Sequence, residues 1–325
     1  MNAYLFVHFR EKRTPDGEQV HFALSRDGLH WEAVNGGRPV LWAYHGKKGV
    51  RDFTVCRSRI DGRFYIVATD LSLAYGMRNE FAGSWALVGS QGSRALSVWE
   101  SEDLVHWTEQ RLCEICTPEF GCAWAPDITY DEAQGDYLLH WSSTTSRDHY
   151  ARHAIYYSRT RDFKTFTPAQ LLYAKEDGPV IDSAMVKEGD VYYLFVKSAG
   201  NPDAVILLRS DSITGPFERV PAFDRSMEAC DGPCNEAPAL LRLEDGRWCM
   251  FIDYYGVPGA GQGYIPFVSE DIASGRFVRC TAARGADAGD AGAMFTFPYG
   301  FKHGSILPIT MEEYERIRSH RWEED

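Results

Sequence analysis

The amino-acid sequence predicts an all-β protein folded as a five-bladed β-propeller, and three observations support this prediction. A short motif recurs five times, a β-hairpin signal precedes four of the copies, and apolar strands near the two termini lack partners of their own. The chain has 325 residues. Because that length exceeds what one simple core supports, a repetitive architecture is expected, and we treat residues 1–325 as a single domain.

The recurring motif is a serine, an aspartate a few residues later and an aromatic residue that ends the segment. Its clearest copies are SRDGLHW and SEDLVHW, in which the aspartate and the tryptophan are four residues apart. The five copies occupy residues 25–31, 101–107, 158–166, 210–217 and 269–277. This spacing is typical of propeller blades of four strands with variable loops. A pair of β-sandwiches, the alternative, does not explain five repeats of similar size.

Tight β-turns are predicted before each of the last four copies, because acidic residues paired with glycine separate apolar runs there. The turn segments are 60–65, 132–137, 188–193 and 244–248. The runs that follow them, such as FYIVATD and VYYLFVKS, are of strand length and rich in β-branched and aromatic residues. Only MEEYERIRSH, near the C-terminus, has a pattern that predicts a helix.

The first blade lacks one half of its hairpin, because the chain begins directly with the strand at Tyr4. The apolar run GSILPI at residues 304–309 has no partner either. Pairing these two strands from both termini would close the ring and remove the exposed sheet edges that an open array leaves.

Charge and hydropathy exclude several classes of partner. The chain has 34 Lys and Arg against 46 Asp and Glu, a formal net charge of −12, without a basic run. This argues against nucleic acid or an anionic membrane as a partner. There is no apolar stretch of membrane-spanning length, and the start MNAYLFVHFREK resembles no signal peptide, so a cytoplasmic protein is predicted.

Eight cysteines are present, and Cys113 and Cys116 have the spacing of half a zinc ribbon or of a thioredoxin-like motif. A zinc ribbon needs a second such pair, and the redox motif needs a βαβ unit. Because neither is found in the sequence, the cysteines are expected to be reduced and packed.

Acidic residues mark the start of the innermost strand in four of the predicted blades. They lie ten or twelve residues before a hairpin aromatic residue and are Asp52, Asp127, Asp182 and Glu236. The fifth blade has His303 just before its innermost strand. Because innermost strands line the central channel, we expect these five residues at one equivalent level around its mouth. Like charges at short range raise one another's pKa, so such a ring is costly unless it is used.

Three uses of this ring are open. The acids could accept backbone N–H bonds at strand ends, which suits Asp127 in particular, or they could bind a structural cation. They could also hydrolyse glycosides, where one acid protonates the leaving oxygen and an ionised one activates water or attacks. Carboxyl groups about 6.5–9.5 Å apart across a channel leave room for water and predict inversion.

Five short motifs, in their order and blade spacing, resemble glycoside hydrolase family 43 over nearly the whole chain. They are GVRD (49–52), GCAWAPD (121–127), VID (180–182), NEAP (235–238) and FKHGSILPI (301–309). The resemblance implies a five-bladed propeller that acts on arabinosyl, xylosyl or sometimes galactosyl linkages. One departure is Phe53, which follows Asp52 where the family usually has a proline and therefore removes a rigid turn.

The resemblance also implies roles for the acids. Asp52 would be the general base, Glu236 the general acid, and Asp182 the acid that orients and tunes the proton donor, in an inverting mechanism that needs no cofactor. His303 is similar to the channel histidine of the family. Its presence implies that a structural Ca²⁺ could be held in the channel through water.

Four further residues are candidates for substrate binding. Phe53 and Trp124 flank the acids and could form a wall of the subsite for the terminal sugar. Arg51 could hold a neighbouring carboxylate in its ionised state, and Asp127 could contact the substrate as well. Loops set specificity in such folds, and the longest in this chain spans residues 74–94 with Trp85 midway.

The expected function is that of an exo-acting inverting glycoside hydrolase. It would release terminal α-L-arabinofuranosyl or β-D-xylosyl units from oligosaccharides derived from arabinoxylan or arabinan. The alternatives are a non-catalytic or weakly active sugar-binding propeller, a hydrolase for another glycon such as β-galactosyl, and a scaffold for a protein partner.

Overall fold

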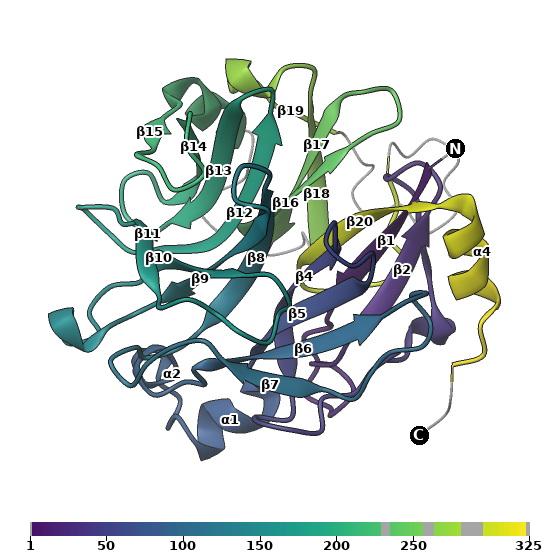
Figure 1. Cartoon of the computed structure of the whole chain (residues 1–325), viewed down its shortest axis with the longest axis horizontal. Coiled ribbons are helices and arrows are strands. Elements are labelled where there is room, and N and C mark those ends of the chain that lie inside the picture. The colour runs from purple at the N-terminus through teal and green to yellow at the C-terminus, as the bar shows by residue number, and fades with distance from the viewer. Residues whose placement is uncertain (1, 229–234, 256–262, 281–294, 323–325) are drawn as a thin grey trace.

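The protein is a five-bladed β-propeller, as predicted. The computed structural model describes residues 2–228, 235–255, 263–280 and 295–322. Within these residues five four-stranded antiparallel sheets radiate from a common centre (Figure 1). The innermost strand of each sheet lies around the middle of this view, and the outermost strands lie at the rim.

Four of the blades are formed by consecutive strands, ordered from the innermost to the outermost. The first complete blade contains β4 (Val50–Arg57), β5 (Phe64–Asp70), β6 (Ala95–Ser101) and β7 (Arg111–Glu114). The second contains β8 (Trp124–Asp131), β9 (Asp136–Ser143), β10 (Ala154–Thr160) and β11 (Gln170–Tyr173). The third contains β12 (Val180–Glu188), β13 (Val191–Ser198), β14 (Ala204–Ser210) and β15 (Glu218–Arg219). The fourth contains β16 (Asn235–Arg242), β17 (Trp248–Tyr254), β18 (Gly263–Ser269) and β19 (Val278–Arg279).

The last blade joins both ends of the chain and closes the ring. Its innermost strand is β20 (Gly304–Thr310), followed by β1 (Asn2–His8), β2 (His21–Ser25) and β3 (Trp31–Ala33). Strand β20 pairs antiparallel with β1, with Leu5 opposite Leu307 (Figure 1). The predicted closure by strands from both termini is therefore confirmed.

The repeated serine–aspartate motif lies where the third strand of a blade turns into the fourth. In the second copy the Asp103 carboxylate accepts hydrogen bonds from the backbone N–H groups of Val105 and His106, at 3.1 and 2.8 Å. Asp27 and Asp162 make the same contacts in their own blades. These aspartates satisfy the backbone of a tight turn, which explains the repeat without a catalytic role.

The expected C-terminal helix is α4 (Met311–Ser319), which begins at a capping box between Thr310 and Glu313. The expectation that it is the sole helix is wrong. The loops also contain α1 (Leu73–Asn79), α2 (Trp85–Ser90) and α3 (Asp224–Met227). The 3₁₀ turns are η1 (Asn35–Gly37), η2 (Ser146–Asp148), η3 (Pro221–Phe223) and η4 (Ile272–Ser274). Such segments are one or two turns long, too short for a 3.6-residue periodicity to show in the sequence.

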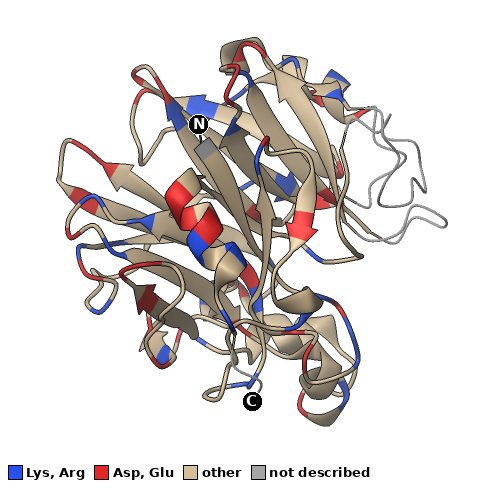
Figure 2. Ribbon diagram, turned by 90° about the vertical axis from the view of Figure 1, so that its right-hand side faces the viewer, with Lys and Arg blue, Asp and Glu red and all other residues tan. Residues whose placement is uncertain are grey.

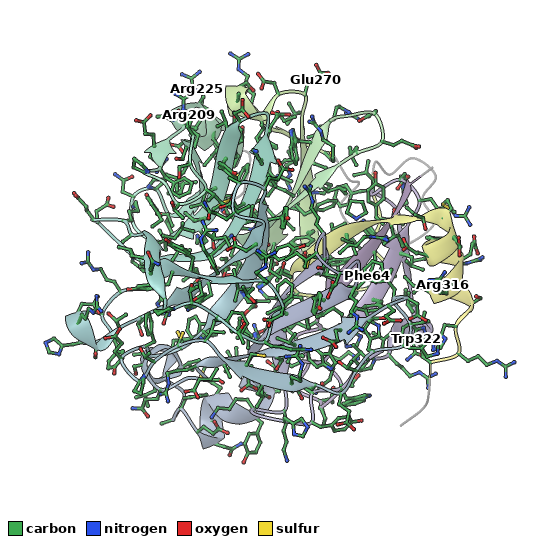
Figure 3. All side chains as sticks on the ribbon, in the orientation of Figure 1. Phe64, Arg209, Arg225, Glu270, Arg316 and Trp322 are labelled. Carbon is green, nitrogen blue, oxygen red and sulfur yellow. The ribbon has the colours of Figure 1, made fainter. Side chains whose placement is uncertain are left out.

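The core consists of side chains packed within and between neighbouring blades. Phe64 is 2% exposed and lies inside the molecule, whereas Arg209, Arg225 and Glu270 point outward at the rim (Figure 3). In α4 acidic residues lie in the first turn and basic residues in the last (Figure 2). The described residues include no helix whose length and hydropathy would allow it to cross a membrane.

Six of the eight cysteines lie in the described residues, and all six are free thiols. Cys113 and Cys116 are buried in the apolar core between the first two complete blades. Burial raises the pKa of both thiols. The prediction that this pair is packed in the core is confirmed.

Candidate active site

The site is built on a β-bulge that recurs near the start of four innermost strands. The pairing with the second strand slips once in each of them, between residues 51 and 54, 124 and 127, 181 and 184, and 236 and 239. The bulged residue has a left-handed backbone, with φ of 50° at Asp52, 48° at Ala125, 51° at Asp182 and 47° at Ala237. A bulge bends the strand and re-aims its side chains, in this protein around the mouth of the channel.

These bulges correct the expectation that the four acids are equivalent. Asp52 and Asp182 occupy the left-handed position, Glu236 precedes it by one residue, and Asp127 follows it by two. The count from the hairpin aromatic residue failed because the hairpin turns differ in length. These turns span 58–63, 132–135, 189–190 and 243–247. Asp52 and Asp182 are therefore equivalent to each other, whereas Glu236 and Asp127 occupy other positions on their strands.

A narrow cavity of about 90 Å³ runs along the channel between the innermost strands. Asp52, Phe53, Asp127, Asp182 and His303 all line it, together with Ala125, Pro126 and Ala237. All five innermost strands contribute to its walls. The structure therefore brings these sequence-predicted residues together.

Asp52 is held by a histidine from the opposite end of the chain. His303 Nε2 lies 2.7 Å from Asp52 Oδ1, and the Thr69 hydroxyl hydrogen-bonds the same carboxylate. Burial would raise the pKa of Asp52, but the hydrogen bond and charge of His303, together with Arg51, outweigh burial and lower it. Asp52 is consequently ionised and fixed in orientation at neutral pH.

His303 has a second carboxylate on its other ring nitrogen. Its Nδ1 atom lies 2.7 Å from Oδ2 of Asp253, a fully buried residue of β17. Although burial disfavours the charged ring, the hydrogen bonds to Asp253 and Asp52 raise the pKa of His303 to about 10. The imidazolium therefore donates to both carboxylates.

Lys302 is the functional neighbour that sequence reasoning missed. Its ammonium lies 3.0 Å from Glu236 Oε1 and 2.9 Å from Asp253 Oδ2, and its side chain is 4% exposed. Burial lowers the pKa of Lys302, but the carboxylates of Asp253 and Glu236 outweigh burial and raise it. Glu236 is thus held by a buried cation, next to Ala237, which lines the cavity.

Asp182 differs from the other acids in its protonation. Burial, followed by the charge of Glu236, raises the pKa of Asp182 to about 8. The positive charges of His303 and Lys302 offset these two effects only in part. At neutral pH the site therefore holds a protonated Asp182 beside an ionised Asp52.

Arg51 is buried rather than exposed, and its guanidinium binds an acid outside the channel. It lies 2.7 Å from Glu18 Oε1 and 4.5 Å from the centre of the Phe9 ring. Glu18 also accepts hydrogen bonds from the backbone N–H groups of Leu73 and Ala74 at the start of α1. Arg51 therefore anchors the loop helix next to the site, and its charge helps to lower the pKa of Asp52.

Phe53 and Asp127 line the cavity but are engaged mainly by the protein. Phe53 is 4% exposed and packs beside Phe9 in the core. Asp127 accepts hydrogen bonds from the Thr54 hydroxyl at 3.1 Å and from the Met185 backbone N–H at 2.9 Å. These contacts tie three innermost strands together, so Asp127 has the structural role that was one of the open interpretations.

Trp124 is the first residue of the innermost strand β8 and lies at the end of the channel where this strand begins. It stacks on His153 at 4.6 Å and meets the edge of Trp85 at 6.5 Å. The next residue, Ala125, donates its N–H to the Thr69 hydroxyl that also bonds Asp52. The residue next to Trp124 is therefore linked to Asp52 through the Thr69 hydroxyl.

The candidate metal ligands among the described residues do not suit direct coordination of a metal ion as they are arranged. Among the described residues one group, Glu236, Asp253 and His303, has ligand atoms within 4.8 Å of one another. Its oxygens already receive the Lys302 ammonium and the His303 imidazolium. Two fixed cations supply the positive charge there, and a Ca²⁺ ion would need carboxylate oxygens that these groups occupy.

Besides Lys302, sequence reasoning missed Asp253 and Thr69, and two of these three residues had faint signals. Asp253 is an acidic residue within the apolar run MFIDYY, which is unusual for a buried strand unless the charge is paired. Lys302 stands beside His303 in a motif that was noticed for its histidine. Thr69 had no signal, because threonine is common in strands.

The comparisons with known proteins give the family of this chain, a curated relative and solved structures of the same fold. A family model described as "Probable glycosyl hydrolase domain", related to glycoside hydrolase family 43, matches residues 1–315. A curated α-L-arabinofuranosidase of Bifidobacterium longum subsp. longum is 30% identical over 244 residues, which cover 66% of this chain. The chain spans only 22% of the length of that relative.

Solved structures show the same fold at low sequence identity. An endo-1,4-β-xylanase from Bacteroides thetaiotaomicron matches with a TM-score of 0.58 and 14% identity, over 86% of this chain and 91% of that one. An endo-arabinase from the same organism matches with a TM-score of 0.57 and 14% identity, over 82% and 88%. These likenesses support the propeller architecture.

Proposed function

Because the chain belongs to the family of glycosyl hydrolase domains related to glycoside hydrolase family 43, we propose that it is an exo-acting, inverting glycosidase. The observation that supports this best is the pair of unlike acids in one channel. Asp52 is kept ionised by His303, whereas the pKa of Asp182 is raised to about 8. Glycoside hydrolysis by two carboxyl groups needs one ionised group and one source of a proton.

In the proposed reaction Asp52 is the general base. It accepts a proton from a water molecule whose oxygen forms a bond to the anomeric carbon. The bond from that carbon to the leaving oxygen breaks, and Glu236 donates a proton to this oxygen. The products are the free sugar with inverted configuration and the shortened oligosaccharide.

Asp182 serves this reaction as the store of the proton that Glu236 delivers. The Lys302 ammonium lies 3.0 Å from Glu236, while Asp182 carries a proton at neutral pH. We propose that the two acids share this one proton and that it moves to Glu236 when a sugar displaces water from the site. Asp182 thereby sets the upper pH limit of activity.

The size of the channel favours release of single terminal units. Its cavity of about 90 Å³ is well below the roughly 300 Å³ of pockets that enclose drug-sized ligands. The terminal sugar would therefore lie at the mouth of the channel, above Asp52. The rest of the oligosaccharide would lie across the surrounding face of the propeller.

The candidate glycons are ranked by the relatives of this chain. The 30% identical relative is named as an α-L-arabinofuranosidase, which favours α-L-arabinofuranosyl units from arabinan- or arabinoxylan-derived oligosaccharides. Terminal β-D-xylosyl units are the second candidate, and β-galactosyl units the third. A propeller that binds sugar without cleaving it is the non-catalytic alternative.

Glu236→Gln tests the assignment of the proton donor. We expect a large loss of kcat on oligosaccharides, whose leaving oxygen needs a proton, and a much smaller loss on aryl glycosides with acidic phenols. Wild-type protein and Glu244→Gln, a change in the exposed turn before β17, are the references. Equal losses on both kinds of substrate would contradict the assignment.

A further inference from the structure

One tryptophan of the described residues is exposed to solvent. All nine tryptophans lie in the described residues, and Trp85 is the one of these that is exposed, at 58%. It is the first residue of α2, in the loop that joins β5 to β6. This loop lies on the face at which the innermost strands begin, because Asp70 at the end of β5 pairs with Val50 at the start of β4.

Trp85 belongs to a row of three rings whose middle member, Trp124, is next in the chain to a residue that lines the cavity. Its ring meets Trp124 edge to face, with centres 6.5 Å apart and planes at 82°. Trp124 in turn stacks on His153, at 4.6 Å and 25°. Trp124 is adjacent to Ala125, and the Thr69 hydroxyl bonds both Ala125 and Asp52. The row of rings therefore lies next to the candidate active site.

The helix that presents Trp85 is fixed tightly to the second complete blade. A Cβ at Gly89 of α2 would meet His153 Cε1 at 3.0 Å, and one at Gly121 would meet the Gly89 oxygen at 2.3 Å. The Thr144 hydroxyl donates to that same oxygen at 2.6 Å. These contacts favour glycine at both positions and hold α2 against the blade, so Trp85 is exposed on a fixed support.

The row of rings carries no charge at neutral pH. Burial lowers the pKa of His153 to about 4, so its imidazole is neutral. A neutral aromatic surface suits the C–H face of a neutral sugar, which packs on it by dispersion while its hydroxyl groups stay in water.

We propose that Trp85, supported by Trp124, binds the sugar unit on the leaving-group side of the cleaved bond. The inference rests on the proposed function, because it takes the terminal unit to lie above Asp52. The cavity there is too narrow for further sugar units. The second unit would therefore lie outside the cavity, on the face of the propeller where the row of rings is found. The ligand class is a neutral pentose oligosaccharide of two or more units.

Length-dependent binding tests this proposal without relying on turnover. We would measure the dissociation constants of arabinose, arabinotriose, xylose and xylotriose by calorimetry, for wild-type protein and for Trp85→Ala. We expect the affinity for the preferred trisaccharide to fall about 10-fold, the scale of one lost stacking contact. The affinity for the matching monosaccharide should change by less than about two-fold on the same scale.

Two further variants make the result specific. Trp85→Phe keeps an aromatic face and should restore most of the trisaccharide affinity. Leu171→Ala removes another exposed apolar side chain, 56% exposed on the outermost strand β11, and should change nothing. Equal affinities of wild type and Trp85→Ala for both trisaccharides, or equal losses for the monosaccharide, would overturn the proposal.

The outcomes separate this inference from the proposed function. If the trisaccharide binds through Trp85 but is never cleaved, the binding role of Trp85 stands and the hydrolase assignment fails. If oligosaccharides are cleaved and Trp85→Ala binds them as wild type does, the hydrolase assignment stands and the binding role fails. If wild-type protein binds neither trisaccharide, the binding role is overturned as well.

Discussion

Replacing Asp182 with asparagine should stabilise the protein while it removes activity. The carboxyl group is held in surroundings that oppose its ionisation, with a pKa of about 8 instead of the ordinary 3.8. Its side chain is partly exposed to the channel, and the hydrogen bond from its backbone N–H to the Ser142 hydroxyl survives the change. Asparagine keeps the shape and removes the cost of ionising the group.

The expected gain in the free energy of unfolding follows from the raised pKa of Asp182. Since the folded-state pKa lies above the unfolded value, the folded protein holds the proton more tightly, and the cost of ionisation grows as pH rises from about 4 to about 8. Each pKa unit corresponds to about 1.4 kcal/mol, so a shift of about four units corresponds to roughly 6 kcal/mol at most. Screening by channel water reduces this energy. We therefore expect Asp182→Asn to be about 2–3 kcal/mol more stable than wild type at pH 8.

Urea unfolding at pH 4.5 and at pH 8 measures the effect. Asp182→Asn should have nearly the free energy of unfolding of wild type at pH 4.5 and exceed it at pH 8. Asp190→Asn, an exposed acid in the turn after β12, serves as the matched control and should show no such pH dependence. A gain that is the same at both pH values, or a loss at pH 8, would refute the reasoning.

Three other predictions concern the surroundings of the site. Chelation with EDTA should change the rate of hydrolysis less than about two-fold, because the Lys302 ammonium already occupies the carboxylates; a loss that Ca²⁺ restores would contradict this. Glu18→Ala leaves Arg51 buried without its closest partner and should cost about 3–5 kcal/mol in urea unfolding; a cost below about 1 kcal/mol would be the opposite result. Gly121→Ala forces a Cβ to within 2.3 Å of a backbone oxygen of α2 and should lower the stability by about 1–3 kcal/mol; an unchanged melting temperature would argue against the tight packing of α2.

The architecture was predictable from sequence because its signals repeat. Turn aspartates such as Asp103 are needed in several blades to satisfy the same backbone groups, so they recur at blade spacing. The closure of the ring followed from two strands without partners, which pair as β1 and β20. The loop helices α1 and α2 were not predictable, since they are short and are held by contacts from elsewhere, such as Glu18 at the start of α1.

Several residues that line the channel could be singled out from the sequence, but the geometry of the candidate site could not. Asp52, Asp182 and His303 were identified from motifs and line one cavity. Their relative positions depend on where each strand bulges, which a residue count cannot reveal because hairpin turns vary in length. The pairing of Lys302 with Glu236 and Asp253 joins residues far apart in the chain, and no local pattern specifies such a contact.

The most direct test of the central proposal is hydrolysis of three aryl glycosides, an α-L-arabinofuranoside, a β-D-xyloside and a β-D-galactoside, by wild type and Asp52→Asn. Asp127→Asn, which alters an acid of the same channel that is engaged by the strands around it, is the matched control. We predict that wild type cleaves one of the three, that Asp52→Asn loses this activity, and that Asp127→Asn retains more of it. Folded wild-type protein that cleaves none of them, or an Asp52→Asn variant as active as wild type, would contradict the proposed mechanism.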